Sequence, residues 1–461
     1  MNKELTGRDL IDAGLKPGKW FPQAIEAANA TLRAGGSRED AMAAALDVAP
    51  RTVPIRGRGE LTFNVNIVAE NEHEASNIAS CVETMTELMR TPVIRAGSIM
   101  PDACPAGSVG TIPVGGVAAS EAIHPGMHSA DICCSMAISI MPGADPAALL
   151  DAVQEATHFG PGARPEHRRI ELPPFLAASF AGNPFLADKM ELAVTNFATQ
   201  GDGNHFAYVG TMKSTGETVL VTHHGSRGPG AALYKSGMRV AEKYRAQLSP
   251  ETLKQNAWIP ADTTEGADYW AALQSIREWT RESHYAIHNE AAARLGASVV
   301  DRFWNEHNFV FRKSDGLFYH GKGATPAFDG WAHDATDLTI IPLNMAEPIL
   351  IARGKNAPNG LGFSPHGAGR NFSRTQHKRQ NEGRTDEDIF AEETKGIDAR
   401  FYMGIPDISE LPSAYKNAAS VRAQIERFGL AEIVDEVIPH GCIMAGDWER
   451  DAPWRKARRS A

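Results

Sequence analysis

The sequence predicts a mixed α/β protein in which one large catalytic domain, residues 51–461, follows a small helical extension, residues 1–50. Segments that alternate apolar and polar residues, as strands do, are interleaved with segments of helical spacing. No internal repeat, low-complexity linker or sharp change of composition divides the chain. Candidate metal-binding and catalytic residues are scattered between positions 131 and 366, so the chain must fold back on itself to bring them together.

The first elements belong to the helical extension and to its junction with the large domain. Residues 8–46 predict two short helices, around the sequences GLKPGKW and AGGSRED. Ser37 is suited to cap the second helix, because Asp40 follows it at the spacing of a capping box. The sequence LTFNVNI, which begins at Leu61, has the period of two that predicts a strand.

The central part of the chain predicts strands that are followed by long helices. Residues 132–140 and 218–223 are strand candidates, and the second ends in the turn HGSRGPG. Helices are expected over residues 231–248 and 267–296, where Gly296 is suited to end the second one. Further along, NFVFRK, SDG and LFYHGKG indicate a β-hairpin, and residues 338–354 indicate two short strands.

Composition and charge limit the class of protein. Five cysteines, of which Cys133 and Cys134 are adjacent, argue against a disulfide framework and for a reducing compartment such as the cytoplasm. No apolar run approaches the roughly 18 residues of a membrane span, and no signal peptide is visible. The net charge of −10 argues against broad, non-specific affinity for nucleic acid.

Five side chains that suit a divalent metal stand in compact polar or glycine-rich sequences. A carboxylate, a thiolate and imidazoles form a mixed ligand set that suits a borderline metal ion. Taken alone, the cysteine of the set is more typical of a buried structural residue, and on a strand its neighbour Cys133 would point to the opposite face. The candidate ligands are Asp131, Cys134, His205, His223 and His307.

A separate pair of histidines, His284 and His288, lies four residues apart on the predicted long helix. This spacing can hold a metal, but Tyr285 stands where a helical zinc motif would have its glutamate. Two interpretations stay open, a metal site or two ordinary residues on a helix face, and the second is favoured.

The sequence SPHGAGR is the strongest single motif. His366 is flanked by small residues, and Gly367, Ala368 and Gly369 allow the backbone to approach a ligand closely. Arg370 offers a bidentate contact to phosphate. Because a neutral imidazole can attack phosphorus, the motif indicates nucleophilic catalysis by histidine on a phosphorylated substrate.

Phosphate contacts are also expected outside this motif. The glycines of GDGNHF let backbone N–H groups approach a phosphate, and HHGSRGPG has the form of a phosphate loop before a helix. Since the net charge is acidic, a path for nucleic acid must be a local basic groove. The candidate residues for phosphate or RNA are Arg227, Arg370, Arg374, Lys378 and Arg379.

Eight ordered motifs together resemble the RtcB family of RNA ligases. They are MPDACPAG, HSADICCSM, GNHF, HHGSRGPG, HNFVF, HGKGATPA, SPHGAGR and ELPSAYKNAASV, and the resemblance covers most of the chain from about residue 98 to 446. The resemblance implies an RtcB-like fold and a site with two manganese ions, which Cys134 would bridge. Asp131 and His205 would complete one metal site, and His223 and His307 the other.

The same resemblance implies a reaction that uses GTP. His366 would become guanylylated, and the GMP would pass to an RNA 3′-phosphate, from which an incoming 5′-hydroxyl would displace it. A 2′,3′-cyclic phosphate would first be opened by hydrolysis. The implied GMP contacts are Asn204, His205, Tyr208, Asn308, Asn344, Met345, His366, Gly367, Ala368, Gly369 and Tyr415.

Five places depart from the family pattern. Cys104 stands in place of a histidine, Tyr208 of a glutamate, Ile349 of a serine and Ala445 of a lysine, and the sequence PLNMA at residues 342–346 stands in place of PGSMG. The residues that would bind metal and the histidine that would act as the nucleophile are retained, whereas the residues that would contact the nucleobase of GMP are altered. This combination looks like the branch often encoded beside peptide chain release factor H, which suggests a link to that factor and repair of ribosomal RNA.

Two other functions stay open. A binuclear metallohydrolase or cyclic phosphodiesterase would retain the metals and lose nucleotidyl transfer, and a ribosome- or factor-binding protein would retain only the fold. The presence of His366 and Arg370 favours the ligase, because a hydrolase needs no such nucleophile. The intact ligand set argues against a protein without enzymatic activity.

Overall fold

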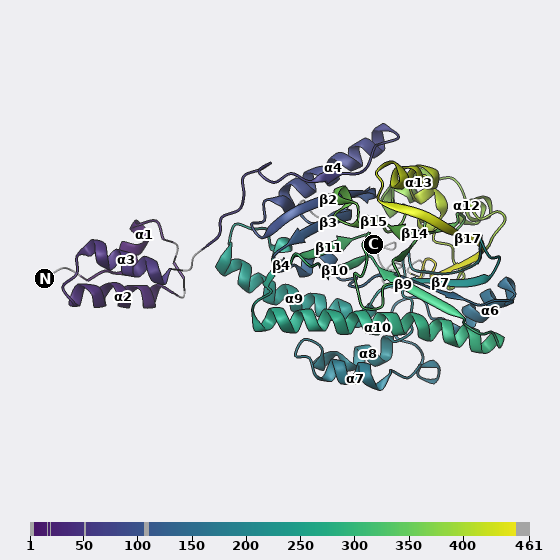
Figure 1. The fold of residues 1–461 in the computed structure, drawn as a ribbon, viewed down its shortest axis with the longest axis horizontal. Helices are drawn as coiled ribbons and strands as arrows, with labels where there is room; N and C mark the ends of the chain where they lie inside the picture. Colours follow the sequence, from purple (N-terminus) through teal and green to yellow (C-terminus); the bar gives the residue numbers. More distant parts are fainter. Residues whose placement is uncertain (1–3, 16, 19, 50–51, 106–109, 449–461) are drawn as a thin grey trace.

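The computed structural model describes residues 4–15, 17–18, 20–49, 52–105 and 110–448 (Figure 1). The last two residues of the MPDACPAG motif lie outside these ranges. Helices and β-sheets are mixed along the chain, which confirms the predicted fold class. Within the described residues, no helix is both long enough and apolar enough to cross a membrane.

Three helices, rather than the two expected, form the N-terminal part of the chain. They are α1 (Gly7–Asp12), α2 (Phe21–Arg33) and α3 (Arg38–Val48), and the glycine and proline residues of GLKPGKW separate the first two. The expected cap is confirmed, because Ser37 Oγ accepts a hydrogen bond of 3.1 Å from the N–H of Asp40. Figure 1 shows these helices apart from the rest of the chain. Their own apolar core consists of Leu5, Leu10, Phe21, Ala24, Ala28, Ala41 and Ala45.

The largest sheet has the strand order β13-β14-β17-β6-β7-β5-β9, with β16 beside β17. The N–H of Ile340 in β13 donates to the side chain of Asn305 in β9 at 2.8 Å, so the two end strands meet and the sheet closes on itself. The strands predicted at 218–223 and within 338–354 are confirmed. The strands are β5 (Ser135–Ile140), β6 (Phe206–Met212), β7 (Thr218–His224), β9 (Asp301–Glu306), β13 (Leu338–Ile341), β14 (Ile349–Gly354), β16 (Asp398–Phe401) and β17 (Ala431–Met444).

A second sheet has the order β1-β2-β3-β11-β10, and β10 and β11 form the predicted hairpin. The strand predicted from LTFNVNI is mostly wrong, because only Asn64 and Val65 pair with β2 at the edge of this sheet. The strands are β1 (Asn64–Val65), β2 (Ile94–Cys104), β3 (Val114–Ser120), β10 (Asn308–Arg312) and β11 (Phe318–Lys322). Two short ladders pair β4 (Ala122–Ile123) with β8 (Ile259–Pro260) and β12 (Ala324–Pro326) with β15 (Phe363–Pro365).

Two long helices pack on these sheets. They are α9 (Arg227–Leu248), which begins within the HGSRGPG sequence, and α10 (Thr264–Leu295), which ends as predicted at Gly296 with a φ of 67°. The remaining helices are α4 (Glu72–Met89), α5 (Pro125–His128), α6 (Pro146–Ala156), α7 (Pro174–Ala181), α8 (Met190–Asn196), α11 (Arg374–Gln380), α12 (Asp386–Glu393) and α13 (Ala418–Arg427).

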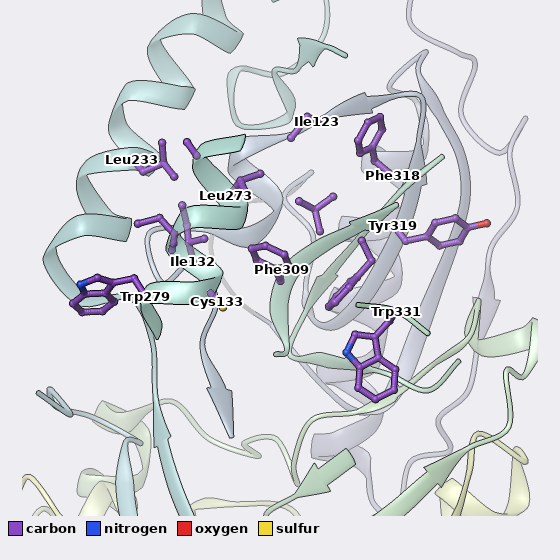
Figure 2. Packing of buried hydrophobic residues seen from close by; sticks show 14 of the residues in the cluster. Ile123, Ile132, Cys133, Leu233, Leu273, Trp279, Phe309, Phe318, Tyr319 and Trp331 are labelled. Carbon is purple, nitrogen blue, oxygen red and sulfur yellow. The ribbon is translucent and has the colours of Figure 1, made fainter. Parts of the chain in front are cut away.

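The main apolar core lies between the long helices and the second sheet. Figure 2 shows Leu233 of α9 and Leu273 and Trp279 of α10 on one side, with Phe309 and Phe318 of the hairpin on the other. This core fixes the position of β10 and β11 relative to the helices. The chain that enters β5 passes beside it.

The strand predicted over residues 132–140 begins only at Ser135, so the two adjacent cysteines precede it. Cys133 has a φ of 58°, which turns the chain directly before the strand. Its side chain belongs to the main core, whereas Cys134 lines a cavity. The two cysteines therefore do face different surroundings, but a turn and not the alternation of a strand separates them.

Candidate active site

A cavity of about 260 Å³ lies beside the large sheet, at the edge where β5 and β6 begin and β7 and β9 end. Cys134 precedes β5, His223 is in β7, and His307 follows β9. Because these neighbouring strands are antiparallel, the start of one lies beside the end of the next. The sheet therefore gathers side chains that are distant in the sequence, and His205, directly before β6, joins them.

Two groups of ligand atoms share the thiol of Cys134. One group joins it with His223 and His307, the other with Asp131 and His205, and within each group the atoms lie within 4.8 Å of one another. The Sγ atom of Cys134 is 3.2 Å from Nε2 of His223 and 3.4 Å from Nε2 of His205. The structure thus brings all five candidate ligands together around one sulfur atom.

Two of the imidazoles are oriented by backbone carbonyls. Nδ1 of His205 donates to the carbonyl of Gln200 at 2.6 Å, and Nδ1 of His223 donates to that of Asn204 at 3.1 Å. Each ring then presents the lone pair of Nε2 to the cluster, which is the usual arrangement around metal-binding histidines. Burial also lowers the pKa of His223 to about 3, so its imidazole is neutral.

The donor set fits a pair of divalent ions. It offers a carboxylate, a thiol and three imidazoles, of which only the carboxylate of Asp131 is substantially exposed, at 41%. Burial raises the pKa of the Cys134 thiol well above its usual range. A bound metal must therefore displace the thiol proton.

His366 lies directly beside this cluster, with its ring centroid 4.8 Å from that of His307. Its Nδ1 atom is 2.5 Å from the carboxylate of Asp102, a fully buried residue of β2. The contact places a proton on Nδ1, so the lone pair of the neutral ring lies on Nε2. Gly323 makes room for the ring, because a Cβ at this position would lie 2.9 Å from Cε1 of His366.

The part of the cavity wall that β6 and β17 form is largely apolar. Phe206 pairs with Met444, and Tyr208 with Cys442, on the neighbouring strands β6 and β17, so the four side chains share one face. The Tyr208 ring is almost fully buried, and its hydroxyl donates to the carbonyl of Val437 at 3.1 Å. This side of the cavity presents carbon and sulfur surface.

Most of the predicted GMP contacts line the same cavity. The exception is His205, which lines a neighbouring groove, although it belongs to the ligand cluster. The altered positions Cys104 and Ile349 also line the cavity, whereas Ala445 is buried in a separate apolar core. The cavity-lining members of the predicted set are Asn204, Tyr208, Asn308, Asn344, Met345, His366, Gly367, Ala368, Gly369 and Tyr415.

Three of the predicted phosphate-binding residues contact other side chains or carbonyls of the protein. Arg370 donates to the carbonyl of Ser409 at 2.7 Å and, with Arg374, contacts the buried carboxylate of Glu410. Lys378 pairs with Asp407 and Asp447 at 3.2 and 3.0 Å. Arg227 and Arg379 line the neighbouring groove and not the cavity. The Arg370 guanidinium thus has contacts with the carbonyls of Phe372 and Ser409 and with Glu410, which orient it, and its binding to phosphate stays a prediction.

His284 and His288 do not join the metal ligands. Thr222 Oγ1 lies 2.7 Å from Nδ1 of His284 and 2.7 Å from Nε2 of His288, and Ser139 Oγ contacts the second ring. Both rings are fully buried and hydrogen-bonded behind the sheet. The interpretation as ordinary residues of a helix face is the one that the contacts support.

Two acidic residues of this site were missed by the sequence interpretation. Asp102 and Glu410 are both buried carboxylates, and each contacts a residue of the SPHGAGR motif. Each also lies within one of the recognised motifs, MPDACPAG or ELPSAYKNAASV. Each is the one acidic residue of its motif, and this was the available signal.

Comparison with known proteins agrees with this geometry. A family model described as tRNA-splicing ligase RtcB matches residues 181–445, which is more than half of the chain. Several proteins named tRNA-splicing ligase RtcB are similar to this chain. Those from Archaeoglobus fulgidus and Aeropyrum pernix are 29% and 28% identical over 285 and 313 residues, or 53% and 56% of this chain and 58% and 63% of their own length.

A third such protein, from Pyrococcus abyssi, is 28% identical over 284 residues, which are 52% of this chain and 30% of that protein. The matched region thus spans less than two thirds of each of these relatives. The family model nevertheless covers β6, β7, β9 and the SPHGAGR loop, which carry three of the five ligands and His366. On this evidence the chain belongs to the RtcB family.

Proposed function

We propose that the protein is an RNA ligase that joins a 3′-phosphate or 2′,3′-cyclic phosphate end to a 5′-hydroxyl end, with GTP as the energy source. The observation that carries this proposal is the pairing of His366 with Asp102 beside the five-ligand cluster. A hydrolytic site activates water at its metal ions and needs no covalent nucleophile. An imidazole held with one nitrogen protonated and the other free is suited to form a phosphoramidate.

The proposed reaction has three transfers of phosphorus. Nε2 of His366 attacks the α-phosphorus of GTP, the bond to the β-phosphate oxygen breaks, and pyrophosphate leaves. An oxygen of the RNA 3′-phosphate then attacks the bound GMP and breaks its P–N bond. Finally the 5′-hydroxyl oxygen attacks the RNA phosphorus, loses its proton and displaces GMP.

The residues of this chain have distinct parts in the proposal. Asp102 keeps the proton on Nδ1 of His366 throughout the first transfer, and the apolar wall with Phe206 and Tyr208 excludes water from the base. The ligands Asp131, Cys134, His205, His223 and His307 would hold two ions, proposed to be Mn²⁺. When bound, such ions neutralise phosphate charge and stabilise the leaving group.

The setting of this activity is also proposed from the resemblance. The chain departs from the family pattern at predicted contacts to the nucleobase but retains the metal ligands. This combination resembles the branch of the family that is linked to release factor H. We therefore propose damaged ribosomal RNA as the substrate and the cytoplasm as the location. The division of the chain into a helical extension, residues 1–50, and a catalytic domain, residues 51–461, belongs to the same proposal.

The alternative is a metallohydrolase or cyclic phosphodiesterase, which the ligand cluster alone would support. A sealing assay separates the two functions. Two RNA halves, one with a 2′,3′-cyclic phosphate and one with a 5′-hydroxyl, are incubated with Mn²⁺, with or without GTP. The ligase gives a joined strand that requires GTP. Opening of the cyclic phosphate without any joining would support the hydrolase, and His366→Ala is the control that lacks only the nucleophile.

A further inference from the structure

The loop that carries His366 is supported at both of its ends. At the start, Asp102 of β2 contacts the backbone and the ring of His366. At the end, Asn371 and Phe372 meet the first turns of helix α4, which packs on β2 (Figure 1). None of the described residues that line the nucleotide cavity belongs to α4, and the helix precedes the residues that the family model matches. Any effect of α4 on the reaction must therefore pass through the residues that it contacts.

Two side chains of α4 donate to one carbonyl oxygen of the loop. Nε2 of His73 donates to the carbonyl of Asn371 at 2.8 Å, and Nδ2 of Asn77 donates to the same oxygen at 2.8 Å. Their spacing of four residues places both side chains on one face of the helix. The ring of His73 also stacks on that of Phe372, with centroids 4.4 Å apart and an angle of 20° between the planes.

A buried ion pair links the same turn of α4 to the segment beside the loop. Oε1 of Glu74 is 3.0 Å from Nζ of Lys416, and the two side chains are 5% and 2% exposed. The N–H of Lys416 donates to the carbonyl of Gly369, within the loop, at 3.0 Å. Loss of one charge of a buried pair leaves the other uncompensated, which strongly disfavours the arrangement. The pair therefore ties Lys416, and through its backbone the loop, to α4.

We propose that His73, Glu74 and Asn77 are positioning residues for nucleotidyl transfer, because they hold the loop against the packed pair of α4 and β2. The inference rests on the proposed role of His366 as the nucleophile and adds the residues that keep its loop in place. The glycine residues of the loop give its backbone little stiffness of its own. A misplacement of about 1 Å can slow a reaction by about 10²-fold, because the reacting atoms must be aligned.

The test uses Glu74→Gln and a double variant, His73→Phe with Asn77→Leu. Glutamine removes the charge that faces Lys416 and keeps the size of the side chain. Phenylalanine keeps a ring that can stack on Phe372, and leucine keeps the approximate volume of asparagine, so the double variant mainly loses its two donors. Adduct formation with GTP and Mn²⁺ is followed over time at several GTP concentrations. Each variant is expected to lower the rate constant by about 10- to 100-fold, while the half-saturating GTP concentration stays within about 3-fold of wild type.

Two controls separate positioning from a loss of folded protein. The final amount of adduct per chain is expected to equal that of wild type, because every folded chain still reacts, but more slowly. Glu83→Gln removes a carboxylate of the same helix that faces the exposed Arg58, and its rate constant is expected to be that of wild type. A reduced final amount with a wild-type rate constant would show that α4 only stabilises the fold, which would overturn the inference. Wild-type rate constants in both test variants would overturn it as well.

The outcome can be separated from that of the proposed ligase function, because hydrogen exchange of the backbone amides needs no GTP. Loss of both donors is expected to speed exchange in the peptide that contains residues 366–374 by about 5- to 10-fold and to leave exchange in β7 unchanged. If wild type forms no adduct, the ligase proposal fails, and exchange still measures whether α4 holds the loop. If wild type forms the adduct, and the variants keep both its rate constant and its exchange, the positioning inference alone fails.

Discussion

The imidazole of His366 and the carboxylate of Asp102 form a hydrogen bond of 2.5 Å, and the backbone N–H of His366 donates to the same carboxylate oxygen at 3.2 Å. One oxygen of a buried strand residue thus fixes both the position of the loop and the proton of the ring. Its other oxygen, Oδ1, is buried without a partner among the described residues. Burying a carboxylate oxygen without a partner costs folding free energy. We explain this cost by the effect of Asp102 on His366, whose ring proton it holds on Nδ1.

Asp102→Asn is expected to slow adduct formation by about 10²–10⁴-fold, the usual contribution of a positioned acid or base. The amide can donate to Nδ1, which moves the ring proton to Nε2 and removes the nucleophile. The measurement is single-turnover labelling with GTP at equal metal content. Asp202→Asn, in the groove, is the matched control. A rate for Asp102→Asn within a few-fold of wild type would remove this carboxylate from the mechanism.

Cys134→Ala is expected to lose both metal ions, because its thiol belongs to both ligand groups. Cys133→Ala is the natural control, since the neighbouring cysteine is equally buried but faces the apolar core. Metal content is measured by elemental analysis after exhaustive dialysis. Cys133→Ala is expected to retain two ions per chain. Two ions in Cys134→Ala would show that the sulfur does not bridge them.

The sequence predicted long elements whose ends are marked by local signals such as a glycine or a turn sequence. It did not predict where short elements begin. The helix that ends at Gly296 and the hairpin around SDG were predicted because their end signals are local. The start of β5 was not, because the positive φ of Cys133 depends on the packing of its side chain in the main core. The extent of the strand within LTFNVNI could likewise not be predicted, because it depends on pairing with β2, which involves only Asn64 and Val65.

The candidate site shows a similar limit. Residue chemistry alone could identify the ligand types, and only the family resemblance implied that they meet at Cys134. Their meeting depends on the order of four strands, which residue chemistry does not reveal. The sequence also does not reveal that the Ser409 carbonyl and Glu410 contact the Arg370 guanidinium, whose binding to phosphate stays a prediction. Asp102 was overlooked because a lone aspartate has no sequence pattern that identifies its partner.

Nucleotide selection is expected to favour GTP, but by less than the 10⁴-fold that a fully matched polar site can give. Guanine needs acceptors for its N1–H and amino group. Tyr208 donates its hydroxyl to a backbone carbonyl, and Oδ1 of Asn344 accepts from the N–H of Ala346 at 3.0 Å. Each unmatched donor weakens binding by about 1–3 kcal/mol.

The measurement for nucleotide selection is adduct formation with GTP and with ATP at equal concentration and equal metal content. We expect both nucleotides to label the protein, and GTP to react faster than ATP, because the apolar wall offers few polar contacts to the base. A preference for GTP of about 10⁴-fold or more would show that acceptors elsewhere in the cavity read the base completely.

Acid is expected to destabilise the metal-free protein below pH 6.5. Burial lowers the pKa of His124 to about 4, from an ordinary value of 6.5, although hydrogen bonds of its ring to the backbone of Asn256 and Ala257 oppose the shift. Between these values the unfolded chain binds the proton and the folded chain does not. Stability is therefore complete above pH 6.5 and is lost as the pH falls toward 4, by at most about 1.4 kcal/mol per pH unit for one histidine.

Urea unfolding at pH 5, 6 and 7 in the presence of a chelator measures this effect. His124→Gln keeps a hydrogen-bonding side chain without a titrating group, so its free energy of unfolding is expected to fall less steeply with acid. Parallel pH profiles for wild type and this variant would remove His124 from the account.

The central claim is that His366 carries the nucleotide, and mapping of the covalent adduct tests it most directly. The competitor is Lys322, which lines the same cavity and whose pKa burial lowers, so that it is a plausible amine nucleophile. Wild type is incubated with Mn²⁺ and α-labelled GTP, digested, and the labelled peptide identified. The account predicts an acid-labile adduct on His366, absent from a His366→Ala variant that keeps its metal. An adduct on Lys322, or none in metal-loaded wild type, would contradict it.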